Sequence, residues 1–183
     1  MRYYLMEGVM DYPDGWYLGD VSTEDNWVFV EGVELDPTQF SNLTIELDEK
    51  GIELDYTTTI SYDVPIVSRE FAECLDGYMD DIQLIPASVP NARNDYFILV
   101  VKNKLECVDT KRSEFSLFEE GNDIRPDRVG DFEAIDELRL DKSKIDKDIF
   151  RIARYEVMLI VSEKVKMDLE KAELTGFTFK LVE

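Results

Sequence analysis

An uninterrupted apolar run near the C-terminal end of the sequence constrains the fold of this chain most strongly. Val157–Val161 contains no polar residue, which indicates a strand buried on both faces. Ser162 follows at once and can cap a helix, because its hydroxyl accepts a hydrogen bond from a free backbone N–H of the first turn. The apolar residues of 149–152 indicate a short strand before the run. The pattern therefore predicts a strand that leads directly into a helix.

The residues after Ser162 continue this prediction to the end of the sequence. Val165, Leu169 and Ala172 fall on one face of a helix. Gly176 lies where a left-handed residue commonly ends a helix. Apolar residues then alternate from Phe177 to Leu181, which is the period of a strand. Strand, capped helix and strand together form one compact hydrophobic unit.

A fainter copy of this unit occurs earlier in the chain. Val64–Ser68 has an apolar run that ends in serine, and Phe71 and Leu75 follow at the same offsets as the apolar residues of the later helix. Gly77 is expected to end this helix, and Ile82–Ile85 supplies the next strand. A duplication and an independent use of a common pattern both explain the likeness.

The remaining apolar and alternating segments predict further strands and an α+β fold, with a mainly antiparallel or mixed β-sheet and two short helices in the repeated strand–helix–strand unit. The expected strands are 2–6, 16–18, 27–30, 43–47, 52–56, 96–101, 105–108 and 115–118. Residues 48–51 are predicted to join two of them as a hairpin turn, and residues 119–130 to form an exposed loop. We expect one domain over residues 1–183, with a β-rich acidic part at 1–62 and both units within 63–183.

Negative charge is concentrated in the first third of the chain. The sequence has 41 acidic and 20 basic residues, for a net charge of −21, and residues 1–63 hold 15 of the acids and 2 of the bases. Such a surface repels nucleic acids and anionic lipids, and it accelerates encounters with a basic partner. Solubility alone is the other explanation for the charge, but its uneven distribution favours a partner.

Several chemistries lack their usual residues. The chain has no histidine, which removes histidine-based acid–base catalysis, Ser-His-Asp sites and histidine metal ligands. It has no phosphate-binding glycine motif, so neither a cofactor nor a metal is expected. No apolar run has the ~18 residues of a membrane helix. Cys74 and Cys107 are predicted to be reduced, mostly buried thiols of a cytoplasmic protein, and Asp80 and Asp81 to be solvated loop charges.

An ordered series of short segments resembles a known family. The segments are Val64–Phe71, Asp81–Pro86, Tyr96–Val100, Asp148–Ile152, Leu159–Ser162 and Leu174–Phe177. In this order they resemble immunity protein family eleven of bacterial polymorphic toxin systems, over residues 60–183. The resemblance implies a small cytoplasmic α+β protein that binds and neutralises a toxin encoded beside it, and it implies no catalytic residue.

Acidic and aromatic residues near the N-terminus are the candidates for contact with such a toxin, because interfaces favour aromatic anchors inside a polar rim. The candidates are Asp11, Asp14, Trp16, Tyr17, Asp20, Glu24 and Asp25. Trp27 is a further aromatic residue of this region, although a core position explains it better. Two other functions remain open. One is an acidic mimic of nucleic acid that inhibits a basic nuclease. The other is a hydrolase that uses carboxylates only and needs at least two buried acids in a deep pocket.

Overall fold

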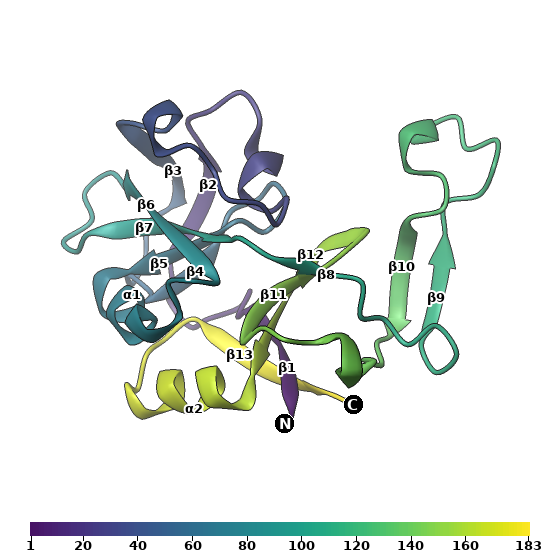
Figure 1. Cartoon of the computed structure of the whole chain (residues 1–183). Helices are drawn as coiled ribbons and strands as arrows, with labels where there is room; N and C mark the ends of the chain where they lie inside the picture. Colours follow the sequence, from purple (N-terminus) through teal and green to yellow (C-terminus); the bar gives the residue numbers. More distant parts are fainter.

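The computed structural model describes residues 1–183 and has an α+β fold, as predicted (Figure 1). The strands are β1 (Tyr3–Gly8), β2 (Tyr17–Val21), β3 (Leu43–Glu49), β4 (Tyr56–Thr58), β5 (Pro65–Ser68), β6 (Ile82–Ser88), β7 (Tyr96–Val101), β8 (Lys104–Leu105), β9 (Glu114–Leu117), β10 (Phe132–Glu137), β11 (Ile149–Ile152), β12 (Tyr155–Ser162) and β13 (Phe177–Val182). The α-helices are α1 (Arg69–Cys74) and α2 (Glu163–Lys171). Short 3₁₀ helices are η1 (Asn26–Phe29), η2 (Pro37–Gln39), η3 (Asp76–Tyr78), η4 (Pro126–Arg128) and η5 (Lys142–Lys144).

The strands form two larger mixed sheets and a two-stranded ribbon. The six-stranded sheet has the order β2-β3-β6-β7-β5-β4, and the five-stranded sheet has the order β13-β1-β12-β11-β8. The very apolar β7 is a central strand, as its composition predicts. Figure 1 shows the β9–β10 ribbon at the side of the molecule, with the expected loop between its strands.

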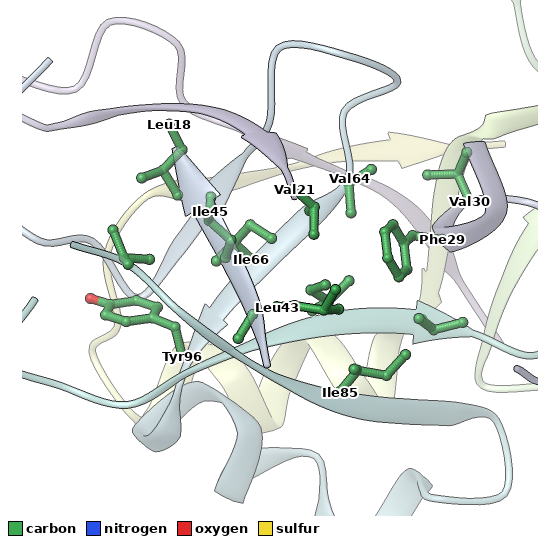
Figure 2. Close-up of a cluster of buried hydrophobic side chains, with 14 of the residues drawn as sticks. Leu18, Val21, Phe29, Val30, Leu43, Ile45, Val64, Ile66, Ile85 and Tyr96 are labelled. Carbon is green, nitrogen blue, oxygen red and sulfur yellow. The ribbon is translucent and has the colours of Figure 1, made fainter. Parts of the chain in front are cut away.

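Alternating side chains of the central strands supply three hydrophobic cores. Ile98 and Val100 of β7 pack with residues of β2 and β3 in an outer core, where Figure 2 shows Leu43, Ile45 and Ile66 gathered. Leu99 points the other way, into a shared core that both sheets and both α-helices build.

The five-stranded sheet is also covered on both faces. Leu159 and Val161 of β12 enter the shared core, whereas Ile160 enters a third core on the opposite face. Phe132 and Ile135 of the β9–β10 ribbon close this third core. The prediction that the 157–161 run is buried on both faces is therefore confirmed for its second half, whereas Val157 itself is exposed.

The two strand–helix–strand elements have the same topology. In β5–α1–β6, the strand β7 lies between the other two and is antiparallel to both. In β12–α2–β13, the strand β1 occupies this middle position with the same orientation. A further antiparallel strand lies beside each element, β4 beside β5 and β11 beside β12.

The hydrogen bonds at the start of the two α-helices also match. Ser68 donates its N–H to the Asp55 carbonyl at 2.8 Å, and its Oγ lies 2.8 Å from Asp55 Oδ1. Ser162 makes the same two contacts with Asp148, at 2.8 and 2.5 Å. Each serine Oγ then accepts from the backbone N–H three residues on, which confirms the predicted cap at Ser162 and shows the same cap at Ser68. A common origin of the two elements stays a prediction.

Replacing Ser162 with alanine is expected to lower the free energy of unfolding by about 2 kcal/mol, because it removes the cap of α2 and leaves the Asp148 carboxylate without this donor. Denaturation with urea checks this value. Ser116 is the matched control, since it is exposed on β9 and its side chain makes no hydrogen bond. Equal stabilities of the two alanine variants would contradict the prediction.

Two predicted strands in the first third, 27–30 and 52–56, are wrong, whereas 43–47 lies within β3. Residues 27–30 lie largely in the 3₁₀ helix η1, because the Asp25 side chain accepts from the Trp27 N–H at 2.8 Å and starts a helical turn. Residues 43–47 and 52–56 do not form a hairpin. Instead β3 pairs with β2 and β6, and residue 52 forms only an isolated bridge with Gly15.

Both glycines that were expected to end helices have other roles. Gly77 lies inside η3, and α1 ends before it. Helix α2 ends at Lys171, and Glu173, with φ +53°, is the left-handed residue that follows. Gly176 is also left-handed, with φ +95°, but it lies against β4 rather than at the helix end. Ala172 is exposed and does not belong to the apolar face.

Asp81 is not a solvated loop charge, although Asp80 is exposed as predicted. Asp81 is buried, and its Oδ2 accepts from the N–H groups of Asp148 and Ile149 at 3.1 and 3.2 Å. It therefore ties the start of β6 to the start of β11. Both cysteines are free thiols, with Cys107 buried and Cys74 partly buried.

Candidate functional site

A concave site of about 310 Å³ lies beside the β1–β2 connection, and we call it the Trp16 cleft. Residues after β1, residues of β2 and β4, and the turn after β4 line it together. The lining residues that matter below are Val9, Met10, Trp16, Tyr17, Leu54 and Ile60. Half of the 18 residues that line the cleft are hydrophobic, so it can bury an apolar group of a partner.

Trp16 forms the floor of this cleft and belongs to the outer core. Its side chain is only 4% exposed, and its ring centroid lies 5.0 Å from that of Tyr96. The indole Nε1 donates to Thr57 Oγ1 at 2.9 Å, so the polar atom of the ring is satisfied within the protein. Trp16 therefore shapes the cleft, whereas Tyr17 is exposed at its side.

Large apolar side chains stand exposed around the opening. Met10 and Ile60 are each 70% exposed, and both line the cleft. Val9 lies beside Met10, and the exposed Tyr62 follows in the same turn as Ile60. Single exposed apolar residues are common, but a group of them around a hollow is typical of a binding surface.

The charges at the cleft are all negative. Asp48, Glu49 and Asp63 line it, and neither lysine nor arginine does. Asp11 and Asp14 are exposed on the loop that carries Met10 and Trp16. The combination of an apolar interior with an acidic, base-free rim suits a partner that has an apolar anchor surrounded by basic groups.

Three residues near the cleft adopt left-handed backbone conformations without being glycine. They are Asp14, with φ +57°, Tyr62, with φ +62°, and Asp63, with φ +51°. A bulky residue such as tyrosine rarely adopts a positive φ. Strain of this kind persists only where the surrounding structure holds it, and it clusters at functional sites. The turn 59–63 is held by Asp20, whose carboxylate accepts from the N–H of Ser61 at 2.9 Å and from its Oγ at 2.7 Å.

The structure brings together some of the predicted contact residues and separates others. Trp16 and Tyr17 line the cleft, Asp11 and Asp14 lie on its loop, and Asp20 supports its wall. Glu24 and Asp25 lie on the connection from β2 to η1, where Asp25 caps η1 and Glu24 is exposed without a side-chain bond. A contact of these residues with a toxin stays a prediction.

The apolar rim of the cleft leaves no recognisable pattern in the sequence. Met10 and Ile60 are isolated apolar residues in turns, and only the folded chain places them around one hollow. Trp27 is partly buried rather than fully in the core. Its ring lies 5.3 Å from that of Tyr62, and the Arg128 guanidinium lies 5.9 Å above it.

Buried carboxylates do not converge in the structure. Asp81 and Glu156 are the buried acids, and neither of them lines the Trp16 cleft. Glu156 instead accepts from the Arg154 N–H at 3.1 Å and pairs with Lys104 at 3.8 Å. No group of three or more cysteine, aspartate or glutamate side chains is placed to hold a metal ion. Neither α-helix has the length and hydropathy that crossing a membrane requires.

Comparison with known proteins assigns the family. No curated protein matches this sequence. The model of the immunity protein family (Imm11) matches residues 82–183, which is more than half of the chain. The matched part begins at β6 and includes the β12–α2–β13 element, whereas the Trp16 cleft is built almost wholly from residues before it. The chain belongs to the immunity protein family (Imm11).

Proposed function

We propose that the protein is a non-enzymatic immunity protein that binds a cognate bacterial toxin in the cytoplasm and blocks it. Membership of the immunity family supports a role against a toxin. The observation that carries the choice of surface is the Trp16 cleft, which joins exposed apolar side chains to a rim with acids and no bases. No nucleic acid, membrane or cofactor takes part in the proposed function.

The chemistry of the cleft describes the toxin surface that it would receive. An apolar anchor of the toxin enters between Met10 and Ile60, over the Trp16 floor. Lysine or arginine side chains around this anchor face Asp48, Glu49 and the acids of the 11–14 loop. Burial of the anchor gives most of the affinity, and the charges steer the encounter.

Co-expression tests the function itself. The C-terminal domain of the large open reading frame beside the gene for this protein is expressed with and without it, and growth and co-purification are measured. Rescue of growth together with a stable complex is the expected result. Continued killing without a complex would refute the proposed function, whatever the surface involved.

A pair of substitutions tests the surface. Met10→Asp combined with Ile60→Asp is expected to weaken toxin binding by about 30-fold or more, because each change puts a charge where an apolar anchor would be buried. Ile124→Asp is the matched control, since Ile124 is 87% exposed in the β9–β10 loop. Titration calorimetry with the purified toxin domain measures the unmodified protein, the double variant and the control. Equal affinities of the double variant and the control would exclude the cleft.

Acidic residues whose side chains make no hydrogen bond or ion pair are the ones suited to test the role of charge in toxin binding. Asp20 and Asp25 hold the 59–63 turn and η1, so reversing their charge disturbs the fold. Asp11 and Glu24 are exposed and make no side-chain bond. We expect Asp11→Lys to weaken toxin binding at low salt more than Glu24→Lys, because Asp11 is next to Met10 of the cleft. A larger loss of affinity from Glu24→Lys would indicate that the interface lies nearer to η1 than to the cleft.

The base-free rim also favours a second candidate, an acidic mimic of nucleic acid that sequesters a basic nuclease. Such a mimic binds several unrelated basic proteins, and its affinity falls steeply with salt. An immunity protein has one partner and depends less on salt, because the shape of the cleft carries the specificity. Binding assays with the toxin domain and unrelated basic nucleases, at low and physiological salt, separate the two.

A further inference from the structure

A second cavity, of about 340 Å³, lies between the two large sheets, and we call it the Arg151 cleft. Residues of β1, β4, β11 and β12 line it, and it adjoins the Trp16 cleft through Gly8, Met10 and Tyr56, which line both. Its walls are largely apolar, with Leu5, Met6 and Leu159 among them. Arg151 is its only basic lining residue.

Arg151 is buried on the inner face of the five-stranded sheet. The residue is only 1% exposed. In the β11–β12 ladder it lies opposite Leu159, which belongs to the shared core. Its Nη1 donates to the backbone carbonyls of Glu156 and Val157, at 2.7 and 3.4 Å. Its Nε and Nη2 are buried and have no hydrogen-bond partner. Buried polar groups are nearly always bonded, so these unpartnered donors require an explanation.

The two unpartnered nitrogens form one edge of the guanidinium group. N–H groups on this edge point in parallel and match the two oxygens of a carboxylate. Arg125 shows the same edge in use, since its Nε and Nη2 donate to the two carboxylate oxygens of Asp127 at 3.1 and 2.8 Å. Arg151 presents this edge without an acid, because no carboxylate forms an ion pair with it.

The charges around Arg151 select among anions. Burial lowers the pKa of Arg151 to about 10, so the guanidinium still carries its charge at neutral pH. The lining residues Glu7 and Asp63 are exposed acids. Their negative field opposes a doubly charged phosphate more strongly than a singly charged carboxylate. A carboxylate on an apolar stem also fits the largely apolar walls.

We propose that the Arg151 cleft binds a carboxylate group through Nε and Nη2 of Arg151. The carboxylate comes from a small free molecule or from an acidic side chain of a bound protein, since both present the same two oxygens. The proposal does not rest on toxin binding, because the ligand site is complete within this chain. The bound carboxylate supplies the hydrogen-bond acceptors that Nε and Nη2 of Arg151 lack.

Nuclear magnetic resonance of the whole protein tests the proposal, with the Arg151 Nε–H signal as the readout. Acetate is titrated as the free carboxylate, and N-acetylglutamate methylamide presents a carboxylate as a protein side chain does. Sodium chloride at equal ionic strength is the reference. We expect a saturable shift of this signal with acetate and none with chloride. A shift with both carboxylates means that the cleft also admits a protein side chain, and a shift with acetate alone identifies the small molecule as the source.

Variants separate the cleft from other arginines. Arg151→Lys keeps the charge and removes the planar edge, so acetate affinity, followed by the backbone signals around the cleft, is expected to fall by about tenfold or more. Arg125→Met is the matched control, because its edge already holds Asp127. An absent shift in the unmodified protein, or an equal shift with chloride, would overturn the proposal even if the Arg151 variant fails to fold.

Discussion

Replacing Phe71 with alanine is expected to lower the free energy of unfolding by about 3–5 kcal/mol. Phe71 is fully buried in the shared core, where α1 meets both sheets. Its ring centroid lies 5.5 Å from that of Tyr56 and 5.5 Å from that of Phe177. The substitution removes the buried surface of the ring, both aromatic contacts and the packing that surrounds them.

Urea denaturation of the Phe71→Ala protein measures this loss. The comparison is valid if the m-value, the slope of the unfolding free energy against urea concentration, is unchanged. Met167→Ala is the matched control on the other α-helix. Met167 is 52% exposed, so its truncation is expected to change the stability by no more than about 0.5 kcal/mol. Similar losses from both variants would mean that α1 does not anchor the shared core.

Gly176→Ala is expected to destabilise the protein by about 3 kcal/mol or more. A Cβ at this position would lie 2.0 Å from the Tyr56 carbonyl oxygen and 3.1 Å from Leu54 Cβ. The neighbouring backbone cannot move aside freely, because Gly176 accepts from Val9 N–H at 2.9 Å and Thr175 accepts from Tyr56 N–H at 3.1 Å. The residue lies where the start of β13 joins β1 to β4.

Gly121 separates the two causes of this loss of stability, which are the left-handed backbone and the collision of the new Cβ with β4. Its φ is +88°, close to the +95° of Gly176, but no atom lies within 4 Å of the position of its Cβ. Gly121→Ala therefore reports the cost of the left-handed backbone alone, about 1–2 kcal/mol. The difference between the two variants in urea denaturation measures the collision with β4. Equal losses would show that the collision is relieved without cost.

The elements that the sequence predicted well are those whose signals are local. The apolar composition of β7 and β12 reports burial on both faces, which depends on the strand alone. Ser68 and Ser162 cap helices because the required N–H lies three residues away. The α+β class follows from these two strand–helix–strand elements and the alternating segments around them.

The incorrect hairpin of 43–47 with 52–56 concerns a choice of strand partner that the sequence does not specify. The alternation in 43–47 shows which side chains are buried, but it does not say that β3 pairs with β2 rather than with the segment that follows. Gly51 contributes to this outcome, because a Cβ there would lie 2.4 Å from the Gly15 backbone. Such a close approach between distant segments leaves no local pattern.

The candidate site was only partly predictable for the same reason. Acidic and aromatic residues at 11–17 are adjacent in the chain, so their density is visible in the sequence. The apolar rim joins Met10 to Ile60 across a long stretch of sequence, and only folding brings them together. Arg151 reads as an ordinary residue of a short strand. Its unpartnered edge exists only because β11 lies against the neighbouring sheet.

The middle position of β1 in its sheet suggests a circular permutant of this chain. Tyr3 is paired with Val182 across the β1–β13 ladder, so the start of β1 and the end of β13 are neighbours. A short turn could join them, and the chain could open instead after Gly8. In that circular permutant β13 and β1 form a hairpin, as β6 and β7 already do. Both halves then run strand, strand, helix, strand, strand, and β1 directly follows β13, its neighbour in the sheet.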